Sequence, residues 1–339
     1  MDEKELEKNF GWMDAIDKFE VVDEDIDLDA GVHPLDRDIK YYIRYGVINL
    51  DKPRGPTSHQ VATWVKRILD VGKAGHGGTL DPGVSGVLPI GVERATPAMR
   101  YIVGSEKEYV GVIRLHGDVP ESELDRVLNL FRRGRIYQKP PFRSSVRRKL
   151  RTREIYSFTV VEREGRDLLF RIRCESGFYV RKLAHDIGLL LGVGAHLDEL
   201  RRVAAGPFSE EKYLVSLYDV YAAKYYLDRG DESLVKKVIL PVEYVFKNFP
   251  KLVIKDSAVA SIAYGAQLKR PGVYAYSGGF KEGDIVAVFT KKSELVAVVK
   301  MLYSLDDMLK MEKGVIAETL RVFMERDMYP RMWVKKSGL

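Results

Sequence analysis

A short segment with three glycines, one carboxylate and a proline constrains this chain more than any other. The segment, Gly75 to Pro82, reads Gly-His-Gly-Gly-Thr-Leu-Asp-Pro. Proline restricts the preceding residue to an extended backbone, so Asp81 is expected outside any helix. The glycines allow a sharp chain path and the close approach of another molecule. The segment therefore predicts a rigid loop that presents Asp81 to a bulky ligand, although a structural glycine turn would read similarly.

Two common glycine-rich motifs do not fit this segment. A phosphate-binding loop places Lys and Ser or Thr directly after its last glycine, and no such pair follows here. A dinucleotide fingerprint lies between a strand and a helix, whereas a helical pattern precedes this segment. Thr57 or Ser58 can cap that helix. Its apolar residues are expected on one face: Val61, Trp64, Val65, Ile68 and Leu69.

Further motifs flank the loop on both sides. Lys52 to Ser58 reads Lys-Pro-Arg-Gly-Pro-Thr-Ser, Lys107 to Tyr109 reads Lys-Glu-Tyr, and Tyr179-Val180-Arg181 precedes a helical pattern. This order resembles the TruB family of RNA pseudouridine synthases, whose catalytic motif is Gly-His-x-Gly-Thr-Leu-Asp-Pro. The resemblance extends over roughly Tyr45 to Phe208. Several motifs in a fixed order are far more specific than any one of them.

Periodicity indicates an α+β fold. Alternation over Tyr109–Leu115 and Leu168–Glu175 predicts strands, and the apolar residues from Val180 to Leu191 have helical spacing. Gly192 and Gly194 can end that helix. Strands and helices in irregular order are typical of α+β folds. The resemblance implies a pseudouridine synthase domain with a mixed, mainly antiparallel central sheet.

The sequence pattern of the C-terminal part differs from that of the preceding residues. A tyrosine-rich helical segment, Leu217 to Phe246, leads into β-rich runs at Asp284–Thr290 and Glu294–Lys300, which predict a hairpin. With Ala258–Leu268 and Pro271–Val273 they resemble a PUA domain, a small RNA-binding β-barrel; a generic small barrel is the alternative. We expect four regions: an acidic N-terminal extension (1–44), a catalytic domain (45–249), a PUA domain (250–328) and a C-terminal tail (329–339).

The charge balance favours an RNA partner. Residues 1–35 carry twelve acidic and three basic side chains, whereas the remainder carries 37 acidic and 52 basic ones. A basic body suits a polyanion. Phe10, Trp12 and further apolar residues in the acidic start favour its partial packing on the body.

Composition also limits the kinds of functional site and the cellular location that the chain can have. Cys174 is the only cysteine, it alternates with Phe170 and Ile172, and we expect it to be buried in a strand. The six histidines show no metal-binding spacing. No apolar run reaches membrane-spanning length, and the first residues do not read as a signal peptide. We therefore expect a cytoplasmic protein without a metal or other cofactor.

The resemblance assigns the chemistry to three residues. Pseudouridine formation breaks the C1′–N1 bond of uridine and joins C1′ to C5 of the same base. Asp81 would be the carboxylate that attacks the sugar or the base, or that removes a sugar proton. Arg181 would pair with it, and Tyr109 would stack on the flipped base and serve proton transfer. Taken alone, an exposed helix arginine and a core tyrosine are the commoner fates of such residues.

Three residues are expected to support this site. Lys52 would hold the motif loops in place. His76 would assist base flipping or contact phosphate, unless it only satisfies local hydrogen bonds. Thr79, together with Ser58, would order the loop through hydrogen bonds.

Two surfaces are expected to bind RNA. A basic run without acids, residues 139–153, predicts a mobile loop that closes over phosphates, as the thumb loop of relatives does. Its cationic residues are Lys139, Arg143, Arg147, Arg148, Lys149, Arg151 and Arg153. The second surface lies in the PUA region and comprises Gly265, Ala266, Arg270, Pro271 and Gly272.

Arg143 stands where bacterial relatives usually carry a tyrosine. Together with His116–Pro120 and the N-terminal extension, it resembles the dyskerin branch, the catalytic subunit of H/ACA guide-RNA particles, in a compact archaeal form. That branch implies three small protein partners and a guide RNA whose ACA end docks on the PUA domain.

Several functional alternatives stay open at this point. Guided modification of ribosomal RNA and direct modification of the transfer-RNA T-loop are both compatible with the motifs. A non-catalytic RNA scaffold in ribosome assembly is the alternative from another class, although the intact Asp81, Tyr109 and Arg181 set disfavours it. A metal-dependent nuclease would need clustered carboxylates, and none surround Asp81 in the sequence.

Overall fold

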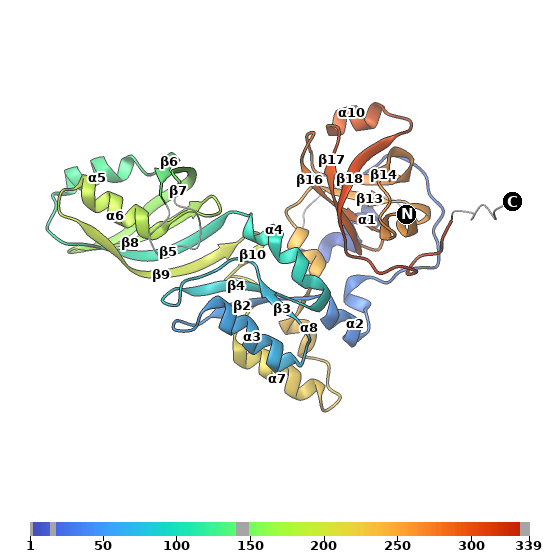
Figure 1. Cartoon of the computed structure of the whole chain (residues 1–339), viewed down its shortest axis with the longest axis horizontal. Coiled ribbons are helices and arrows are strands. Elements are labelled where there is room, and N and C mark those ends of the chain that lie inside the picture. Colours follow the sequence, from blue (N-terminus) through green and yellow to red (C-terminus); the bar gives the residue numbers. More distant parts are fainter. Residues whose placement is uncertain (1–2, 14–17, 140–148, 333–339) are drawn as a thin grey trace. The chain divides into compact units, whose positions relative to one another are not determined.

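The structure is a computed structural model that describes residues 3–13, 18–139 and 149–332. The chain forms two compact units (Figure 1). The central unit comprises Val47–Ile239, and the terminal unit combines Met1–Gly46 with Leu240–Leu339. The beginning and the end of the chain therefore fold together.

The central unit is built on a long sheet. Its strands are β2 (Gly46–Lys52), β3 (Ala74–His76), β4 (Ser85–Val92), β5 (Lys107–Leu115), β6 (Gly134–Gln138), β7 (Arg151–Glu164), β8 (Asp167–Cys174), β9 (Ala195–Ala205), β10 (Phe208–Ser209) and β11 (Leu214–Val215). The main path runs β11-β2-β4-β9-β5-β8-β7-β6, with β3 paired to β4 and β10 to β9. The β11–β2 and β4–β9 pairs are parallel and the other pairs of this path are antiparallel. The expected mixed, mainly antiparallel sheet is confirmed.

Helices cover parts of this sheet (Figure 1). They are α3 (Ser58–Leu69), α4 (Met99–Val103), α5 (Glu121–Asn129), α6 (Val180–Leu190), α7 (Leu217–Leu227) and α8 (Val235–Val238). Helices α5 and α6 pack on β5, β7 and β8 around a core that includes Phe158, Phe170 and Ile172. Cys174 is buried in β8 as predicted, and burial raises the pKa of its thiol to about 12.

Helix α3 begins as the sequence predicts. The Thr57 side chain accepts a hydrogen bond from the Gln60 amide, and the Gln60 side chain accepts one from the Thr57 amide, which forms a capping box. Val61, Val65 and Leu69 are buried on one face. Trp64 is 38% exposed, so this face is not buried over its full width.

The terminal unit contains a second, smaller sheet. Its strands are β1 (Glu20–Val21), β13 (Lys251–Ile254), β14 (Leu268–Lys269), β15 (Val273–Ser277), β16 (Ile285–Phe289), β17 (Leu295–Met301) and β18 (Val315–Val322), in the order β1-β15-β13-β16-β17-β18-β14. Strands β16 and β17 form the predicted antiparallel hairpin. Helices α1 (Glu3–Phe10), α2 (Ile39–Arg44), α9 (Asp256–Ala263) and α10 (Leu305–Lys310) complete the unit.

The acidic N-terminal segment packs on the C-terminal part of this unit. Strand β1 pairs with β15, and the Phe10 and Phe289 rings meet edge to face with centroids 5.2 Å apart. The buried Lys291 Nζ lies 2.8 Å from Asp25 Oδ2 and 3.3 Å from Asp256 Oδ2. The carboxylates beside it offset the cost of taking the Lys291 ammonium out of water, so the acidic residues have a structural role here.

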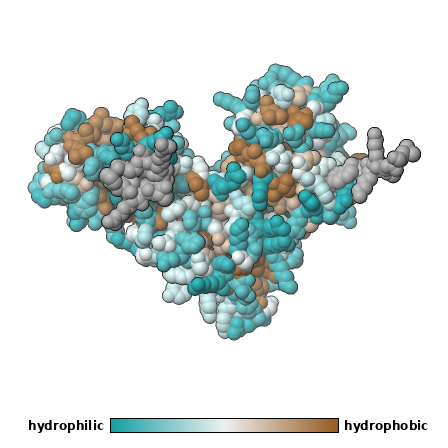
Figure 2. Space-filling model, viewed as in Figure 1, coloured by the Kyte–Doolittle hydropathy of each residue, from teal (hydrophilic) through white to brown (hydrophobic). Residues whose placement is uncertain are grey.

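Polar residues cover most of the face shown in Figure 2, with smaller apolar areas between them. Within the described part of the chain, no helix is both long and apolar enough to cross a bilayer.

Candidate active site

The glycine-rich segment begins in β3 and leads toward β4. Gly78 has a φ of +127°, which side-chain-bearing residues rarely adopt. The other two glycines face their own chain: a Cβ at Gly77 would lie 2.7 Å from Ile102, and one at Gly75 would lie 3.1 Å from Thr96. The expectation that all three glycines admit a ligand was therefore wrong, because two of them allow close internal packing.

Residues of the Lys52–Ser58 motif form hydrogen bonds with backbone atoms of this loop. Ser58 Oγ accepts from the Leu80 amide at 2.8 Å and donates to the Leu80 carbonyl at 3.1 Å. The Gly55 amide donates to the Pro82 carbonyl at 2.8 Å. The residues on both sides of Asp81 are thus fixed by hydrogen bonds.

Lys52 lies fully buried beneath the loop. Its Nζ donates to the carbonyl oxygens of Val84 (2.8 Å) and Pro53 (2.9 Å). Burial lowers the pKa of Lys52, while the nearby Asp81 carboxylate opposes that shift. This is the position that its predicted supporting role requires.

Arg181 and Asp81 meet as the motifs predict. Arg181 follows the first residue of α6, and its Nη2 lies 3.1 Å from Asp81 Oδ2. The two side chains are 65% and 60% exposed. A solvent-exposed ion pair contributes little to stability. The pair therefore matters less for stability than for the orientation of the Asp81 carboxylate.

Tyr109 lies on β5 next to this pair. Its ring is half-buried against the core below α5 and α6. Burial raises the pKa of Tyr109, and the positive charge of the nearby Arg202 guanidinium opposes that shift. Asp81 is also close enough to influence Tyr109. The structure therefore brings Asp81, Arg181, Tyr109 and Lys52 together.

Arg202 is the residue of this site that the sequence motifs did not reveal. It lies in β9 with 1% of its surface exposed. Its Nε donates to the Val87 carbonyl at 2.8 Å and its Nη2 to the Gly78 carbonyl at 3.2 Å. Strand arginines are mostly exposed, as the adjacent Arg201 partly is, so nothing local distinguishes the two.

His76 and Thr79 differ in environment. His76 is half-buried in β3, and its Nδ1 is buried without a hydrogen-bond partner among the described residues. Burial, followed by the charge of Arg202, lowers the pKa of His76. Thr79 is exposed on the loop. Their roles stay predictions.

Three buried cations surround the loop without carboxylate partners. Lys52, Lys107 and Arg202 take part in none of the ion pairs found among residues 3–13, 18–139 and 149–332. Lys107 Nζ donates to the carbonyl oxygens of Ser105 (2.6 Å) and Val103 (2.9 Å), and burial lowers its pKa to about 7. Oriented carbonyls satisfy these groups but do not cancel the charge of those that stay protonated; Lys107 is only partly charged near pH 7, so the positive field near Asp81 comes mainly from Lys52 and Arg202.

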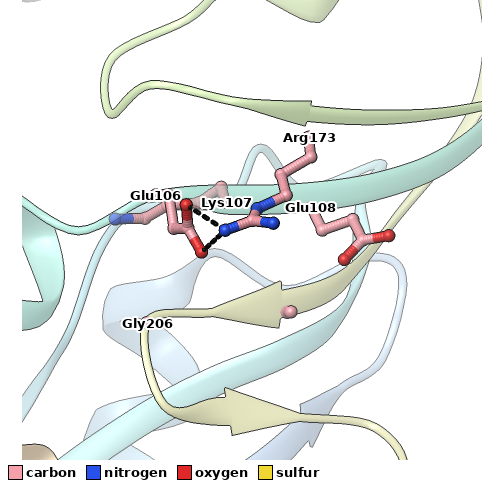
Figure 3. A pocket seen from close by; sticks show the side chains of 6 residues that line it. Glu106, Lys107, Glu108, Arg173 and Gly206 are labelled. Carbon is pink, nitrogen blue, oxygen red and sulfur yellow. Dashed lines mark hydrogen bonds and ion pairs between the residues drawn. The ribbon is translucent and has the colours of Figure 1, made fainter. Parts of the chain in front are cut away.

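A small hollow lies beside this region (Figure 3). Arg173 Nη2 binds both carboxylate oxygens of Glu106 at 2.6 and 2.8 Å, and Arg171 binds Glu108. The charged groups that line the hollow are already engaged, the arginine and glutamates in ion pairs and the Lys107 ammonium by carbonyl oxygens, so we assign it no ligand. It is lined by Glu106, Lys107, Glu108, Arg173, Ala204 and Gly206.

The described residues contain no group of three or more His, Cys, Asp or Glu side chains that could hold a metal ion.

The basic run is only partly described. Arg143, Arg147 and Arg148 lie outside the described residues, whereas Lys139 and Lys149 are exposed. The expectation that Arg151 and Arg153 belong to a loop was wrong, because both lie in β7 and pair with β6.

Arg153 is engaged within the chain. Its Nε donates to the Gly177 carbonyl at 3.1 Å, and its Nη1 lies 3.5 Å from Glu175 Oε1. Arg153 therefore binds the turn between β8 and α6. Its guanidinium is less available to an RNA phosphate than the charge pattern alone suggests.

The predicted RNA-binding residues of the terminal unit lie on two connections of the smaller sheet. Gly265, with a φ of +93°, follows α9, and the Ala266 carbonyl accepts a hydrogen bond from Thr319 Oγ1 at 2.9 Å. Arg270, Pro271 and Gly272 form a short 3₁₀ helix before β15. Their contact with RNA stays a prediction.

Comparison with family models covers almost the whole chain. Residues 66–180 match the TruB family pseudouridylate synthase (N terminal domain), and residues 181–247 match the tRNA pseudouridylate synthase B C-terminal domain. Residues 250–323 match the PUA domain and residues 16–62 the DKCLD (NUC011) domain.

Two curated relatives extend this match. A probable tRNA pseudouridine synthase B from Pyrococcus abyssi is 50% identical over 304 residues, which cover 89% of this chain and 91% of the relative. The chain belongs to the TruB family of pseudouridylate synthases. A second TruB-family relative, a probable tRNA pseudouridine synthase B from Methanothermobacter thermautotrophicus, is 49% identical over 90% of this chain and 94% of the relative.

Solved structures also resemble this chain over nearly its whole length. A chain of a Cbf5–Nop10–Gar1 complex superimposes with a TM-score of 0.88 at 47% identity, covering 94% of this chain and 98% of that chain. A chain of an H/ACA RNP bound to a substrate RNA containing 2′-deoxyuridine gives a TM-score of 0.87 at 46% identity, covering 95% and 99%. The predicted family, its dyskerin-like branch and the fold class are confirmed, and the scaffold alternative is not favoured.

Proposed function

We propose that this pseudouridine synthase isomerises uridine in RNA through Asp81 and acts as the catalytic subunit of an H/ACA particle. The observation that carries the proposal is the Arg181–Asp81 pair, whose nitrogen and oxygen lie 3.1 Å apart at the end of a loop fixed on both sides. A scaffold has no need for an oriented carboxylate beside a half-buried tyrosine.

Each residue has a distinct part in this mechanism. A flipped uridine would stack on Tyr109 and cover the exposed Asp81 carboxylate, which excludes water from it. Asp81 acts at the sugar–base junction while the C1′–N1 bond breaks and the C1′–C5 bond forms; C5 then loses its proton and N1 ends with one, so the reaction is an isomerisation. Arg181 aims the carboxylate, and the buried cations stabilise negative charge on the detached uracil.

The particle mode rests on structural relatives. Chains at 46–47% identity belong to complexes with Nop10, Gar1 and substrate RNA. We infer that this chain assembles with small proteins of the same kinds and with a guide RNA, and that ribosomal and transfer RNA are its substrates. A cytoplasmic location is part of this proposal, and cell fractionation tests it.

The test is pseudouridine formation by the purified chain on two RNAs. One is an unmodified transfer-RNA transcript, and the other is a ribosomal-RNA fragment with and without guide RNA and partner proteins. Asp81→Asn removes the charge and keeps the shape, so we expect turnover to fall at least ~10³-fold while RNA affinity stays within about threefold. Asp118→Asn is the matched control, because Asp118 pairs with Arg166 away from the loop.

The outcomes separate the alternatives. Activity of the chain alone on transfer RNA supports direct recognition, and activity only in the full assembly supports the guided mode. Wild-type turnover in the Asp81→Asn variant, or RNA binding without activity in every mixture, would overturn the catalytic proposal.

A further inference from the structure

A buried glutamine attaches the start of helix α6 to strand β6. Gln138 is the last residue of β6 and is 1% exposed. Its Nε2 donates to the Tyr179 carbonyl at 3.1 Å, and its Oε1 accepts from the Tyr179 amide at 2.9 Å. A side-chain amide carries donors and an acceptor side by side, so Gln138 pairs with both polar groups of one backbone residue. The opposite orientation of the amide would set oxygen against oxygen.

Tyr179 is the residue from which α6 begins. It occupies the N-cap position, and its own side chain makes no capping hydrogen bond. Its carbonyl accepts from the Lys182 and Leu183 amides at 3.0 and 3.2 Å, which are among the first hydrogen bonds of the helix. Hydrogen bonds to Tyr179 therefore fix the backbone of the first turn, and Arg181 lies in that turn.

Strand β7 holds the earlier residues of the same turn. The Glu154 amide donates to Glu175 Oε2 at 3.0 Å, and Arg153 Nε donates to the Gly177 carbonyl at 3.1 Å. These bonds end at Gly177, whereas the Gln138 bonds reach the residue at which the helix starts. The connection from β8 to α6 is thus hydrogen-bonded to two neighbouring strands, and Gln138 supplies the contact nearest to Arg181.

The Arg181–Asp81 pair depends on this backbone. Its nitrogen and oxygen lie 3.1 Å apart, and both side chains are more than half exposed. Water weakens an exposed ion pair, and holding a long arginine side chain in one place costs rotamer freedom. The pair is therefore too weak to pull the start of α6 into position, so the backbone has to be placed by other contacts.

We propose that Gln138 is a positioning residue that aligns Arg181 with the Asp81 carboxylate by holding the backbone of Tyr179. This inference rests on the proposed function and adds a residue that does not touch the reacting atoms. Because Gln138 is buried, it makes no contact with an RNA phosphate. Loss of its amide should therefore slow the chemical step and leave RNA affinity nearly unchanged.

Gln138→Leu removes both hydrogen bonds and keeps a side chain of similar volume. We expect the single-turnover rate, in the assembly or on the substrate that the wild type modifies, to fall at least ~10-fold. RNA affinity should stay within about threefold of the wild type. A rate within threefold of the wild type would overturn the proposal.

Asn49→Leu is the matched control for the loss of a buried amide. Asn49 is fully buried in β2, and its Nδ2 donates to the Ser209 and Lys212 carbonyls at 2.8 and 3.0 Å. Both variants should lower the free energy of unfolding, so rates are compared at a temperature where circular dichroism shows every variant folded. Asn49→Leu should keep turnover within about threefold of the wild type. An equal loss of turnover in the two variants would reduce Gln138 to a structural role and overturn the proposal.

Gln138→Glu adds a pH profile. An ionised carboxylate has no donor for the Tyr179 carbonyl, whereas a protonated carboxyl donates to that carbonyl and accepts from the amide. Burial raises the pKa of the introduced carboxyl above its ordinary value of about 4.3. The rate of the variant, divided by that of the wild type at the same pH, should therefore rise as the pH falls from 8 to 5. A constant ratio while the carboxyl gains its proton, as followed by its ¹³C resonance, would contradict the role of the Gln138 donor.

A structural comparison tests the alignment without turnover. Crystal structures of the wild type and of Gln138→Leu in one crystal form should differ at Arg181, whose Nη2 should move beyond about 4 Å from Asp81 Oδ2. The pairing of β6 with β7 should stay intact. An unchanged Arg181–Asp81 distance would overturn the positioning role. A wild-type chain that is inactive on every RNA tested would count against the proposed function alone.

Discussion

At the scale of a single residue, the pKa of His76 depends on the environment of the catalytic loop. Its ring is half-buried in β3, and burial and the charge of Arg202 both lower its pKa below 6.5. The unfolded chain therefore binds a proton just below pH 6.5 that the native chain does not bind. The free energy of unfolding then has to decrease as the pH falls through that window.

His76→Gln should remove this dependence. The free energy of unfolding of the wild type should fall from pH 7 to pH 5 more steeply than that of the variant, as measured by denaturant titration at each pH. His185→Gln changes an exposed histidine of α6 and is the control. Parallel pH profiles for the wild type and His76→Gln would contradict the burial of a neutral imidazole at this position.

Functional residues can be predicted from the sequence where their neighbours form an unusual motif, and they cannot be predicted where the neighbours are ordinary. Asp81 precedes a proline in a glycine-rich loop, and Arg181 follows Tyr179 at the start of a helix, so both stood out. Arg202 shares its strand with Arg201, and only the fold buries one and exposes the other. Burial of Arg202 depends on contacts with Gly78 and Val87, which lie more than 100 positions away in the sequence.

At the scale of elements, the fit between α6 and β9 decides where Arg181 lies. A Cβ on Gly188 would lie 2.1 Å from the Ala195 amide nitrogen and 2.4 Å from the Gly194 carbonyl carbon. The backbones of the helix and the strand are in direct contact at this glycine. Any larger residue has to shift the helix, because backbone atoms cannot rotate away as a side chain does.

Gly188→Ala should therefore lower both stability and turnover. We expect a loss of about 1–3 kcal/mol in the free energy of unfolding, with a lower single-turnover rate because Arg181 moves with α6. Gly104→Ala is the control, since its Cβ would have no neighbour closer than 3.9 Å. A Gly188→Ala variant as stable and active as the control would show that the contact is looser than described.

Element types were predictable wherever periodicity was strong. β5, β8 and α6 lie where their apolar patterns place them. The basic run led to a wrong prediction for Arg151 and Arg153. Both have the charge pattern of a loop, but they pair with β6 as part of a strand. Charge alone does not distinguish a loop from a strand that leaves one face in water.

At the scale of the whole molecule, the acidic N-terminal segment is part of the terminal unit. Lys291 is 3% exposed and is surrounded by Asp25, Asp27 and Asp256. Sequence composition indicated that the segment packs on the body, but its contacts join residues more than 200 positions apart. No local pattern contains that information.

Lys291→Met should release the N-terminal segment. Removing the cation leaves buried carboxylates unpaired, which costs about 3–5 kcal/mol. We expect a lower denaturation midpoint for the terminal unit and faster cleavage within residues 18–33 in limited proteolysis. Lys310→Met, at an exposed pair with Asp307, is the control. An unchanged cleavage rate in Lys291→Met would show that the apolar contacts of Phe10 hold the segment without the lysine.

The pairing of β1 with β15 also sets an order of events during synthesis. Val21 leaves the ribosome long before its partner Ala275 exists, and at bacterial-like elongation speeds the wait is roughly 10–50 s. The central unit is continuous in sequence and can fold during that interval. The acidic segment stays without its strand partner meanwhile, and its charge keeps it soluble until the last part of the chain emerges.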